Sequence, residues 1–262
     1  MIIIGISGKK QSGKSTFVDY LYKKVPNSKV IRFADNLKQI VLDCFVPPMW
    51  GWDRIEEFET DANKNRTLPC GKTVRQVLQL VGTDWFRNTW EECWINTYKK
   101  NLLRLQKHKS RRNPSVVFTP DVRFPNELRT IQEMGGYVIR LLRAPFADQD
   151  QHESEIALDE VEAKTSRTVR VDYKDFGRNI SDVWKRTLPE FMEKDDHYVG
   201  LCSLARQYPG KFFDIIFDNR EKTLEETCGW VDDHFINCFS WEGDSEFITR
   251  MSFDPTKINI KR

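Results

Sequence analysis

The segment from Gly8 to Ser15 contains the residues of this chain that are best suited to holding phosphate. Its sequence, GKKQSGKS, matches the pattern G-x-x-x-x-G-K-[ST] and follows the apolar run from Ile2 to Ile6. In this pattern the glycines let the backbone wrap around phosphate oxygens, and the following helix directs free amides at them. Because a strand-like run precedes the loop and a helix-like run follows it, we expect this segment to bind ATP or GTP.

Two side chains of this loop have distinct expected roles. Lys14 should reach the β- and γ-phosphates, and the Ser15 hydroxyl should bind Mg²⁺. Mg²⁺ is therefore the expected cofactor, with ATP as the phosphate donor. Nucleotide binding alone does not define a kinase, because GTPases, ATPases and regulatory switches share this loop.

A second polar group follows the apolar run from Ser115 to Thr119. Asp121 stands at the carboxyl end of this predicted strand, where open α/β sheets bind ligands. It could hold the magnesium shell or orient the attacking phosphate. Arg123 offers a bidentate fork for phosphate, and Glu127 could hold that fork or contact a sugar hydroxyl. Taken alone, the segment is explained equally well by an ordinary strand-end Asp beside a surface Arg–Glu pair.

The string VRQVLQLVGT predicts a helix with one polar face. Arg75, Gln79 and Gly82 recur at i, i+4 and i+7, opposite Val77 and Val81. Such a face could combine a phosphate clamp with amides that read a nucleobase. A solvated helix face is the alternative interpretation.

Alternating strand and helix patterns predict an α/β fold, a P-loop NTPase-type three-layer sandwich with a parallel central sheet and insertions. We expect a kinase core over residues 1–236, insertions at about 46–72 and 156–211, and a C-terminal extension at 237–262. Strands are predicted at 2–6, 29–33, 115–119, 137–143 and 212–217, and helices at 14–24, 36–45, 74–81, 126–134 and 224–235, with one or two further helices over 85–105.

Residues 143–155 are the candidate for a lid, because a kinase must exclude water from the reaction. Arg143 and His152 are its candidate functional residues. A surface loop capped by an acidic helix start explains the segment equally well. His152 is not assigned to a metal, because no second His or Cys stands at a ligand spacing.

Composition argues against several other classes of protein. Lys and Arg total 41 and Asp and Glu total 39, so the net charge is +2. A charge this close to balance does not indicate binding to nucleic acid or to an anionic membrane. Six scattered cysteines indicate neither a zinc site nor a disulfide scaffold. The sequence shows no secretory signal or membrane span, so we expect a cytoplasmic protein. The sequence is compatible with a monomer and with a homodimer.

Five strings of the sequence together resemble the deoxynucleoside monophosphate kinases of tailed bacteriophages. They are ISGKKQSGKST, FADNLK, VRQVLQLVGTDWFR, PDVRFPNE and HESE. Their order and approximate spacing agree from Met1 to about Glu155, and more loosely from Phe212 to Phe235. The resemblance implies transfer of the γ-phosphate of ATP to a dNMP or NMP, and a viral protein working in the host cytoplasm.

The resemblance also implies which residues form each part of the site. Catalysis is expected from Lys14, Arg75, Asp121 and Arg123, and metal binding from Ser15 and Asp121. The expected ATP-binding residues are Gly8, Lys10, Ser12, Gly13, Lys14, Ser15 and Thr16. The expected acceptor-binding residues are Arg75, Gln76, Gln79, Gly82, Thr83, Trp94, Arg123 and Glu127, with Trp85 and Trp90 as nearby alternatives to Trp94. This sequence departs from the phage pattern at Ser15, which is often Asp there, and in residues 156–211 and the tail after Asn237.

Three alternatives to a nucleotide kinase remain open from the sequence. A kinase for another small phosphate, similar to phosphomevalonate kinase, has a similar loop, but the amides of Gln76 and Gln79 favour an acceptor with a base. A non-catalytic regulatory module would be expected to lack Lys14, Arg75 or Asp121, and all three are present. A nucleic-acid-dependent ATPase is disfavoured by the balanced charge.

Overall fold

The computed structural model describes residues 1–10, 12–107, 116–142, 152–165, 198–199, 205, 207–218, 223, 226 and 229. These residues form two compact units. The sheet unit comprises Met1–Val30 and the described residues from 116 onward, and the helical unit comprises residues 31–107. Arg143, the extension 237–262 and most of the predicted lid and of the predicted helix at 224–235 lie outside the described residues.

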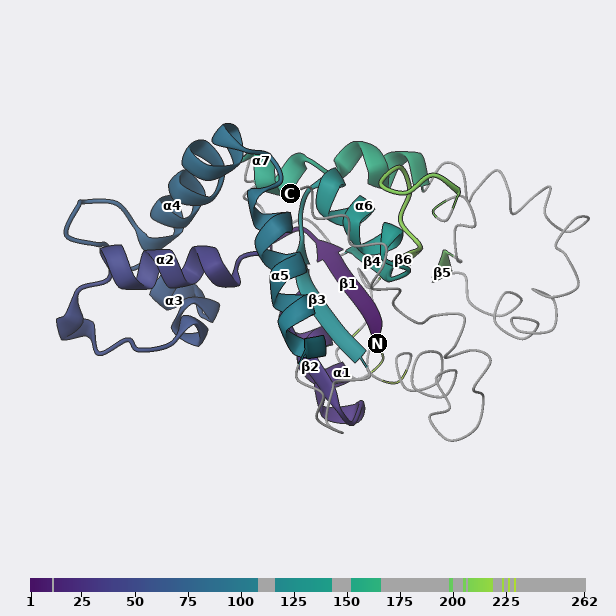
Figure 1. Ribbon diagram of the computed structural model, residues 1–262, viewed down its shortest axis with the longest axis horizontal. Coiled ribbons are helices and arrows are strands. Elements are labelled where there is room, and N and C mark those ends of the chain that lie inside the picture. The colour runs from purple at the N-terminus through teal and green to yellow at the C-terminus, as the bar shows by residue number, and fades with distance from the viewer. Residues whose placement is uncertain are drawn as a thin grey trace, which may run out of the picture. The chain divides into compact units, whose positions relative to one another are not determined.

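The sheet unit is built on six described strands, and the predicted α/β fold is confirmed (Figure 1). Five strands pair in parallel, and the short edge strand β5 pairs antiparallel with β6, which the sequence did not predict. The spatial order is β2-β3-β1-β4-β6-β5. The strands are β1 Ile2–Gly8, β2 Ser28–Val30, β3 Val116–Val122, β4 Tyr137–Leu142, β5 Tyr198–Val199 and β6 Ile215–Asp218.

Helices cover both faces of this sheet. Helix α1, Lys14–Lys24, packs Phe17 and Leu21 against the face that carries Ile4 of β1. Helix α6, Pro125–Glu133, covers the opposite face, where a Cβ on Gly5 would lie 2.7 Å from Ile131 Cδ1. Side chains alternate between faces along a strand, so β1 is apolar on both sides because both sides are covered. This is the predicted three-layer arrangement.

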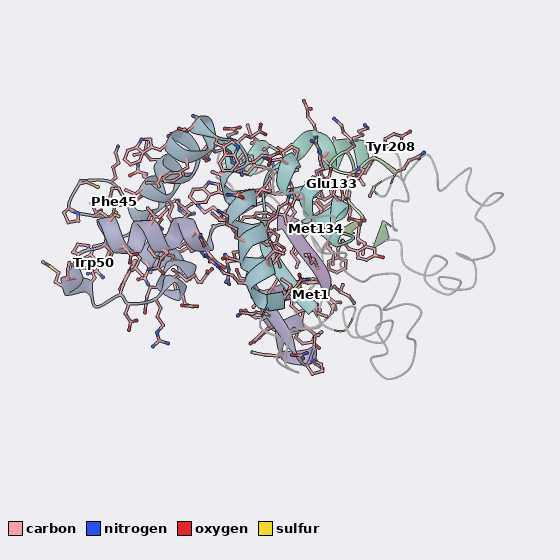
Figure 2. The ribbon with its side chains drawn as sticks, viewed as in Figure 1. Met1, Phe45, Trp50, Glu133, Met134 and Tyr208 are labelled. Carbon is pink, nitrogen blue, oxygen red and sulfur yellow. The ribbon has the colours of Figure 1, made fainter. Side chains whose placement is uncertain are left out.

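The helical unit contains shorter elements around a core of its own. The buried residues of this core are Val41, Leu42, Phe58, Leu68, Val74, Val77 and Val81. Phe45 and Trp50 are partly buried and pack against them (Figure 2). The predicted irregular or partly helical character of 46–72 is confirmed. The elements are α2 Asp35–Phe45, η1 Pro48–Trp50, η2 Ile55–Glu59, α3 Asp61–Lys64, α4 Val74–Gln79, η3 Leu80–Arg87 and α5 Cys93–Lys107.

The helix predicted at 74–81 changes its form after one and a half turns. Helix α4 is α-helical to Gln79, and η3 then continues as a π-helix. The predicted polar face of Arg75, Gln79 and Gly82 is therefore not continuous, since the wider turn breaks the α-helical spacing. Gly82 is buried, where an added Cβ would lie 2.7 Å from Leu37 Cδ2.

Several other boundaries differ from the prediction; for example, β2 ends at Val30 rather than at 33, and β6 begins at Ile215 rather than at 212. The segment 85–105, predicted as one or two helices, is confirmed as two, because η3 runs to Arg87 and α5 begins at Cys93. Strand β3 runs on to Val122, which pairs with Ser7 after an irregularity in β1. Among the residues that the structure describes, no helix combines the length and the apolar character needed to cross a bilayer.

Candidate functional site

The loop between β1 and α1 has a backbone that requires glycine at two positions. Gly13 has a φ of 88° and directly precedes α1. Gly8 has a φ of 152°, and a Cβ there would clash with Ser12 Oγ and lie 2.9 Å from Leu141 O. A side chain at either position would strain the turn, so both glycines fit the backbone role expected of them.

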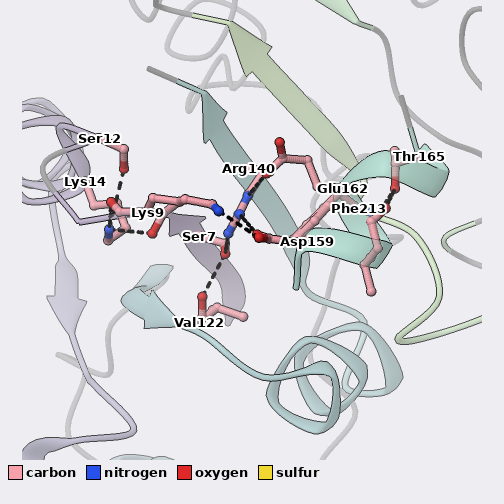
Figure 3. Close-up of polar contacts among 12 residues, drawn as sticks. Ser7, Lys9, Ser12, Lys14, Val122, Arg140, Asp159, Glu162, Thr165 and Phe213 are labelled. Carbon is pink, nitrogen blue, oxygen red and sulfur yellow. Dashed lines mark hydrogen bonds and ion pairs between the residues drawn. The ribbon is translucent and has the colours of Figure 1, made fainter. Parts of the chain in front are cut away.

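Lys14 begins α1 and directs its ammonium into the loop. Its Nζ donates to Gly8 O at 2.6 Å and to Lys9 O at 2.5 Å, and lies 3.4 Å from Ser12 Oγ (Figure 3). Ser12 is buried, and its backbone N–H donates to Lys9 O at 3.1 Å. The loop therefore positions the Lys14 cation over its own concave backbone, where phosphate oxygens would lie.

The carboxyl end of β3 lies beside the start of this loop. Ser7 pairs with Val122 across the two strands, and Ser7 Oγ donates to Val122 O at 2.7 Å. Asp121, which is half-buried, is the residue before Val122 in β3. Asp121 was predicted to follow the strand. It is instead the second-to-last residue of β3, at the predicted carboxyl edge of the sheet.

Ser15 and Asp121 have the donor atoms that suit Mg²⁺. A hydroxyl and a carboxylate oxygen are hard ligands, and Mg²⁺ takes one or two protein oxygens together with phosphate and water. Ser15 is exposed in the first turn of α1. Within the described part of the chain, no three His, Cys, Asp or Glu side chains gather into a metal-binding group. The donor set therefore fits a metal that is held jointly with nucleotide phosphates.

Glu127 fixes the turn that carries Arg123. Its Oε2 accepts the backbone N–H of Arg123 at 2.8 Å and that of Phe124 at 3.2 Å, which caps α6 at its start. The buried carboxylate therefore orders Arg123 through the backbone. The sequence had predicted that Glu127 contacts the Arg123 guanidinium or a sugar hydroxyl, and both contacts stay predictions.

Arg140 connects the loop to the chain beyond the predicted lid, a role that the sequence analysis missed. It is 3% exposed, and its Nε donates to Glu162 Oε2 at 2.7 Å. Its Nη2 lies 3.5 Å from Asp159 Oδ1, and Asp159 Oδ2 also pairs with Lys9 of the loop at 2.7 Å (Figure 3). The available signal was an arginine within the apolar string YVIRLL, which must pair if the strand is buried.

The helical unit carries the candidate acceptor residues on α4. Arg75 Nη2 pairs with Asp61 Oδ1 at 2.6 Å, and Arg75 Nε lies 3.5 Å from Asn65 Oδ1. Gln76 Oε1 accepts the backbone N–H of Thr73 at 2.8 Å, so this amide caps the helix. Arg75 is thus held in a defined position, while a base-reading role for Gln76 and for the half-buried Gln79 stays a prediction.

Trp94 packs onto the π-helix. Its Nε1 donates to Gly82 O at 2.8 Å, and its ring lies 5.1 Å from that of Phe86. Trp94 and Thr83 are both buried. These contacts give Trp94 a part in holding the turn at Gly82, and contact with an acceptor remains a prediction for this residue.

The candidate residues thus divide between the two units. The sheet unit brings together Gly8, Lys10, Ser12, Gly13, Lys14, Ser15, Thr16, Asp121, Arg123 and Glu127. The helical unit contains Arg75, Gln76, Gln79, Gly82, Thr83 and Trp94. His152 is half-buried just before the short helix α7, Glu153–Ile156, and its lid role stays a prediction.

Comparison with known proteins agrees with this architecture. The mainly parallel sheet with helices on both faces defines an α/β protein and is consistent with a P-loop kinase-like sandwich. A family described as deoxynucleotide monophosphate kinase matches residues 49–167. A protein of Acanthamoeba polyphaga mimivirus, named "Putative deoxynucleotide monophosphate kinase", is 34% identical over 166 residues, which cover 60% of this chain and 82% of that protein. The chain belongs to the deoxynucleotide monophosphate kinase family, so it is a kinase of nucleotide metabolism with a viral relative.

Proposed function

We propose that this protein transfers the γ-phosphate of ATP to a deoxynucleoside monophosphate to give the diphosphate. The observation that carries the proposal is the loop at Gly8–Lys14, where two constrained glycines and an inward-directed ammonium give a backbone turn that is suited to phosphate. Membership of the deoxynucleotide monophosphate kinase family supports the class of acceptor. Ribonucleoside monophosphates are the other acceptors that the assay below compares.

The donor phosphates are assigned to the sheet unit. The loop amides and Lys14 would bind the β- and γ-phosphates, while Ser15 and Asp121 would hold Mg²⁺. When bound, Mg²⁺ would neutralise charge on the β- and γ-phosphate oxygens. Arg123, fixed through Glu127, would add positive charge to the transferred group.

The acceptor is assigned to the helical unit, with Arg75 as its principal phosphate ligand. Arginine presents a planar fork of donors that matches phosphate oxygens. A monophosphate oxygen is already a nucleophile, so the reaction needs positioning and charge rather than a general base. This explains why the assigned residues are mostly cations and backbone amides. We place the reaction in the cytoplasm of the cell that makes the protein, without nucleic acid or membrane as a partner.

The assay for this proposal measures ADP and nucleoside diphosphate formation from ATP, Mg²⁺ and each dNMP or NMP in turn. We expect diphosphate from at least one dNMP and a strong loss of product in Arg75→Ala at limiting acceptor. ATP binding without transfer to any nucleotide would contradict the proposal and favour another small phosphorylated acceptor or a regulatory role.

A further inference from the structure

Glu59 lies among several cations of the helical unit. Its Oε1 accepts from Lys38 Nζ at 2.5 Å and lies 3.4 Å from Arg32 Nε. Its backbone carbonyl accepts from Lys64 Nζ at 3.2 Å. Three cations from separate segments therefore converge on the end of η2, although none of them is adjacent to another in sequence.

Arg75 lies at the same cluster. It pairs with Asp61, the first residue of α3, and Lys64 is the last residue of that helix. Lys64 also experiences the positive charges of both Lys38 and Arg75. The segment before α2 and the helices α2, α3 and α4 thus each contribute one of four cations, namely Arg32, Lys38, Lys64 and Arg75. These cations lie against the carboxylates of Asp35, Glu59 and Asp61.

These groups differ in how accessible they are to a ligand. The Lys38 side chain is only 10% exposed and is engaged by Glu59, which suits a supporting position. Arg75 is partly exposed, and its partner Asp61 is 52% exposed and can be rehydrated if it is displaced. Lys64 is half-buried at the surface of the unit. Arg32 is as exposed as Arg75, at 24%, but it is shared between Asp35 and Glu59, which are only 20% and 34% exposed. Because the partner of Arg75 is the more easily rehydrated, Arg75 and Lys64 are the two cations best placed to meet an anion from solution.

The charges around Lys64 also favour the binding of an anion there. Burial lowers the pKa of its ammonium, and the charges of Lys38 and Arg75 lower it further, against the opposing effect of Glu59 and Asp61. A half-buried ammonium beside other cations is in an electropositive environment, and binding of an anion would reduce the repulsion between these cations. Both candidate ligands carry only hydrogen-bond donors, which matches the acceptor oxygens of a phosphate dianion.

We infer that Lys64 joins Arg75 in binding the phosphate of the acceptor. In this arrangement the acceptor phosphate replaces Asp61 as the ion-pair partner of Arg75. Lys38, Arg32 and Glu59 are positioning residues in this arrangement, because their ion pairs fix η2 and thereby Lys64. The inference rests on the proposed function, since it names the phosphate ligands of the same acceptor site.

Calorimetric titration of the full chain with each dNMP, its deoxynucleoside and inorganic phosphate tests this directly. In Lys64→Gln, dNMP should bind about tenfold more weakly, as expected for loss of a charge-assisted hydrogen bond, with affinity for the deoxynucleoside and for ATP unchanged. Asp61→Asn should bind dNMP more tightly. Lys100→Gln, which removes an exposed cation of α5 in the same unit, is the matched control.

Proton uptake separates a ligand from a merely structural lysine. At about pH 8.5 a phosphate monoester, with a second pKa of about 6, is already a dianion. Binding of this dianion should raise the pKa of Lys64, so in a pH series upward from about 8.5 wild-type protein should take up more protons than Lys64→Gln. The measurement compares binding enthalpies in two buffers of different ionisation enthalpy.

The outcomes distinguish this inference from the proposed function. If wild-type protein phosphorylates a dNMP and Lys64→Gln keeps wild-type affinity, KM and proton uptake, the inference is overturned and the function stands. If wild-type protein binds none of the dNMPs and transfers no phosphate, both are overturned. Thermal unfolding of Lys64→Gln checks that weaker binding does not come from a loss of fold.

Discussion

Arg140 Nη1 donates a hydrogen bond of 3.0 Å to Ser7 Oγ, and Ser7 directly precedes the Gly8–Ser15 loop. Ser7 Oγ in turn donates to Val122 O on the neighbouring strand. One buried guanidinium therefore connects β4, β1 and β3 at the end where the loop begins. Through Glu162 it also ties the helical residues 159–165 to the sheet. A charged side chain that is not among the expected nucleotide-binding residues thus anchors the start of the Gly8–Ser15 loop.

Replacing Arg140 by methionine should destabilise the sheet unit. Loss of one partner of a buried ion pair typically reduces stability by 3–5 kcal/mol, but Asp159 and Glu162 are partly exposed and can be rehydrated, so we expect about 2 kcal/mol. Urea denaturation measures the change. Arg104→Met, which alters an exposed arginine on α5, should stay within about 0.5 kcal/mol of wild type. Equal stability of the two variants would refute the supporting role.

Two glycine substitutions should differ sharply in effect. In Gly8→Ala the new Cβ meets the Leu141 carbonyl, a backbone atom, at a positive φ, so we expect a loss of about 2 kcal/mol and weaker ATP binding. In Gly82→Ala the nearest atom is the mobile tip of Leu37, so the loss should be below about 1 kcal/mol. Thermal unfolding with and without ATP measures both. A tolerated Gly8→Ala that keeps its ATP affinity would argue against phosphate binding by the Gly8–Ser15 loop.

Much of the fold could be predicted because short sequence patterns specify individual strands and turns. The β-branched run at Ile2 to Ile6 and the glycine-bounded loop specify a buried strand and the turn to α1, and both are present. The antiparallel edge strand β5 and the π-helix at Leu80–Arg87 were not predicted. Neither has a periodic signature, since the first is two residues long and the second depends on packing of Gly82 and Trp94.

The candidate site was predictable where a motif fixes the chemistry and not where distant side chains meet. The loop around Lys14 is encoded by a short string, so its residues could be named individually. Arg140 pairs with Glu162 and Lys38 with Glu59, across 22 and 21 positions of sequence. Such partners come together only through tertiary structure, and each lysine or glutamate alone resembles an ordinary surface residue.

Acid should destabilise the protein partly through Glu59. Burial raises the pKa of this carboxyl, but Lys38, Arg32 and Lys64 outweigh burial and leave the pKa below its ordinary value. A carboxyl with a lowered folded pKa contributes stability that is present above its unfolded pKa of about 4.3 and is lost as pH falls through the lower folded value. Unfolding free energies of wild type and Glu59→Gln, measured from about pH 7 to about pH 3, should therefore converge at the acidic end. A difference that stays constant across this range would show that Glu59 is not held as the anion.

The central claim is tested most directly by following the γ-phosphorus of labelled ATP in the presence of Mg²⁺ and each dNMP. We predict that the label appears in the nucleoside diphosphate product, and that Lys14→Ala slows its appearance by about 10²–10³-fold while the protein remains folded. Lys23→Ala, which removes an exposed lysine from the last turn of α1, should transfer label at the wild-type rate. Label found only in inorganic phosphate, or transfer that does not depend on Lys14, would contradict the assignment of this protein as a deoxynucleoside monophosphate kinase that uses the Gly8–Ser15 loop.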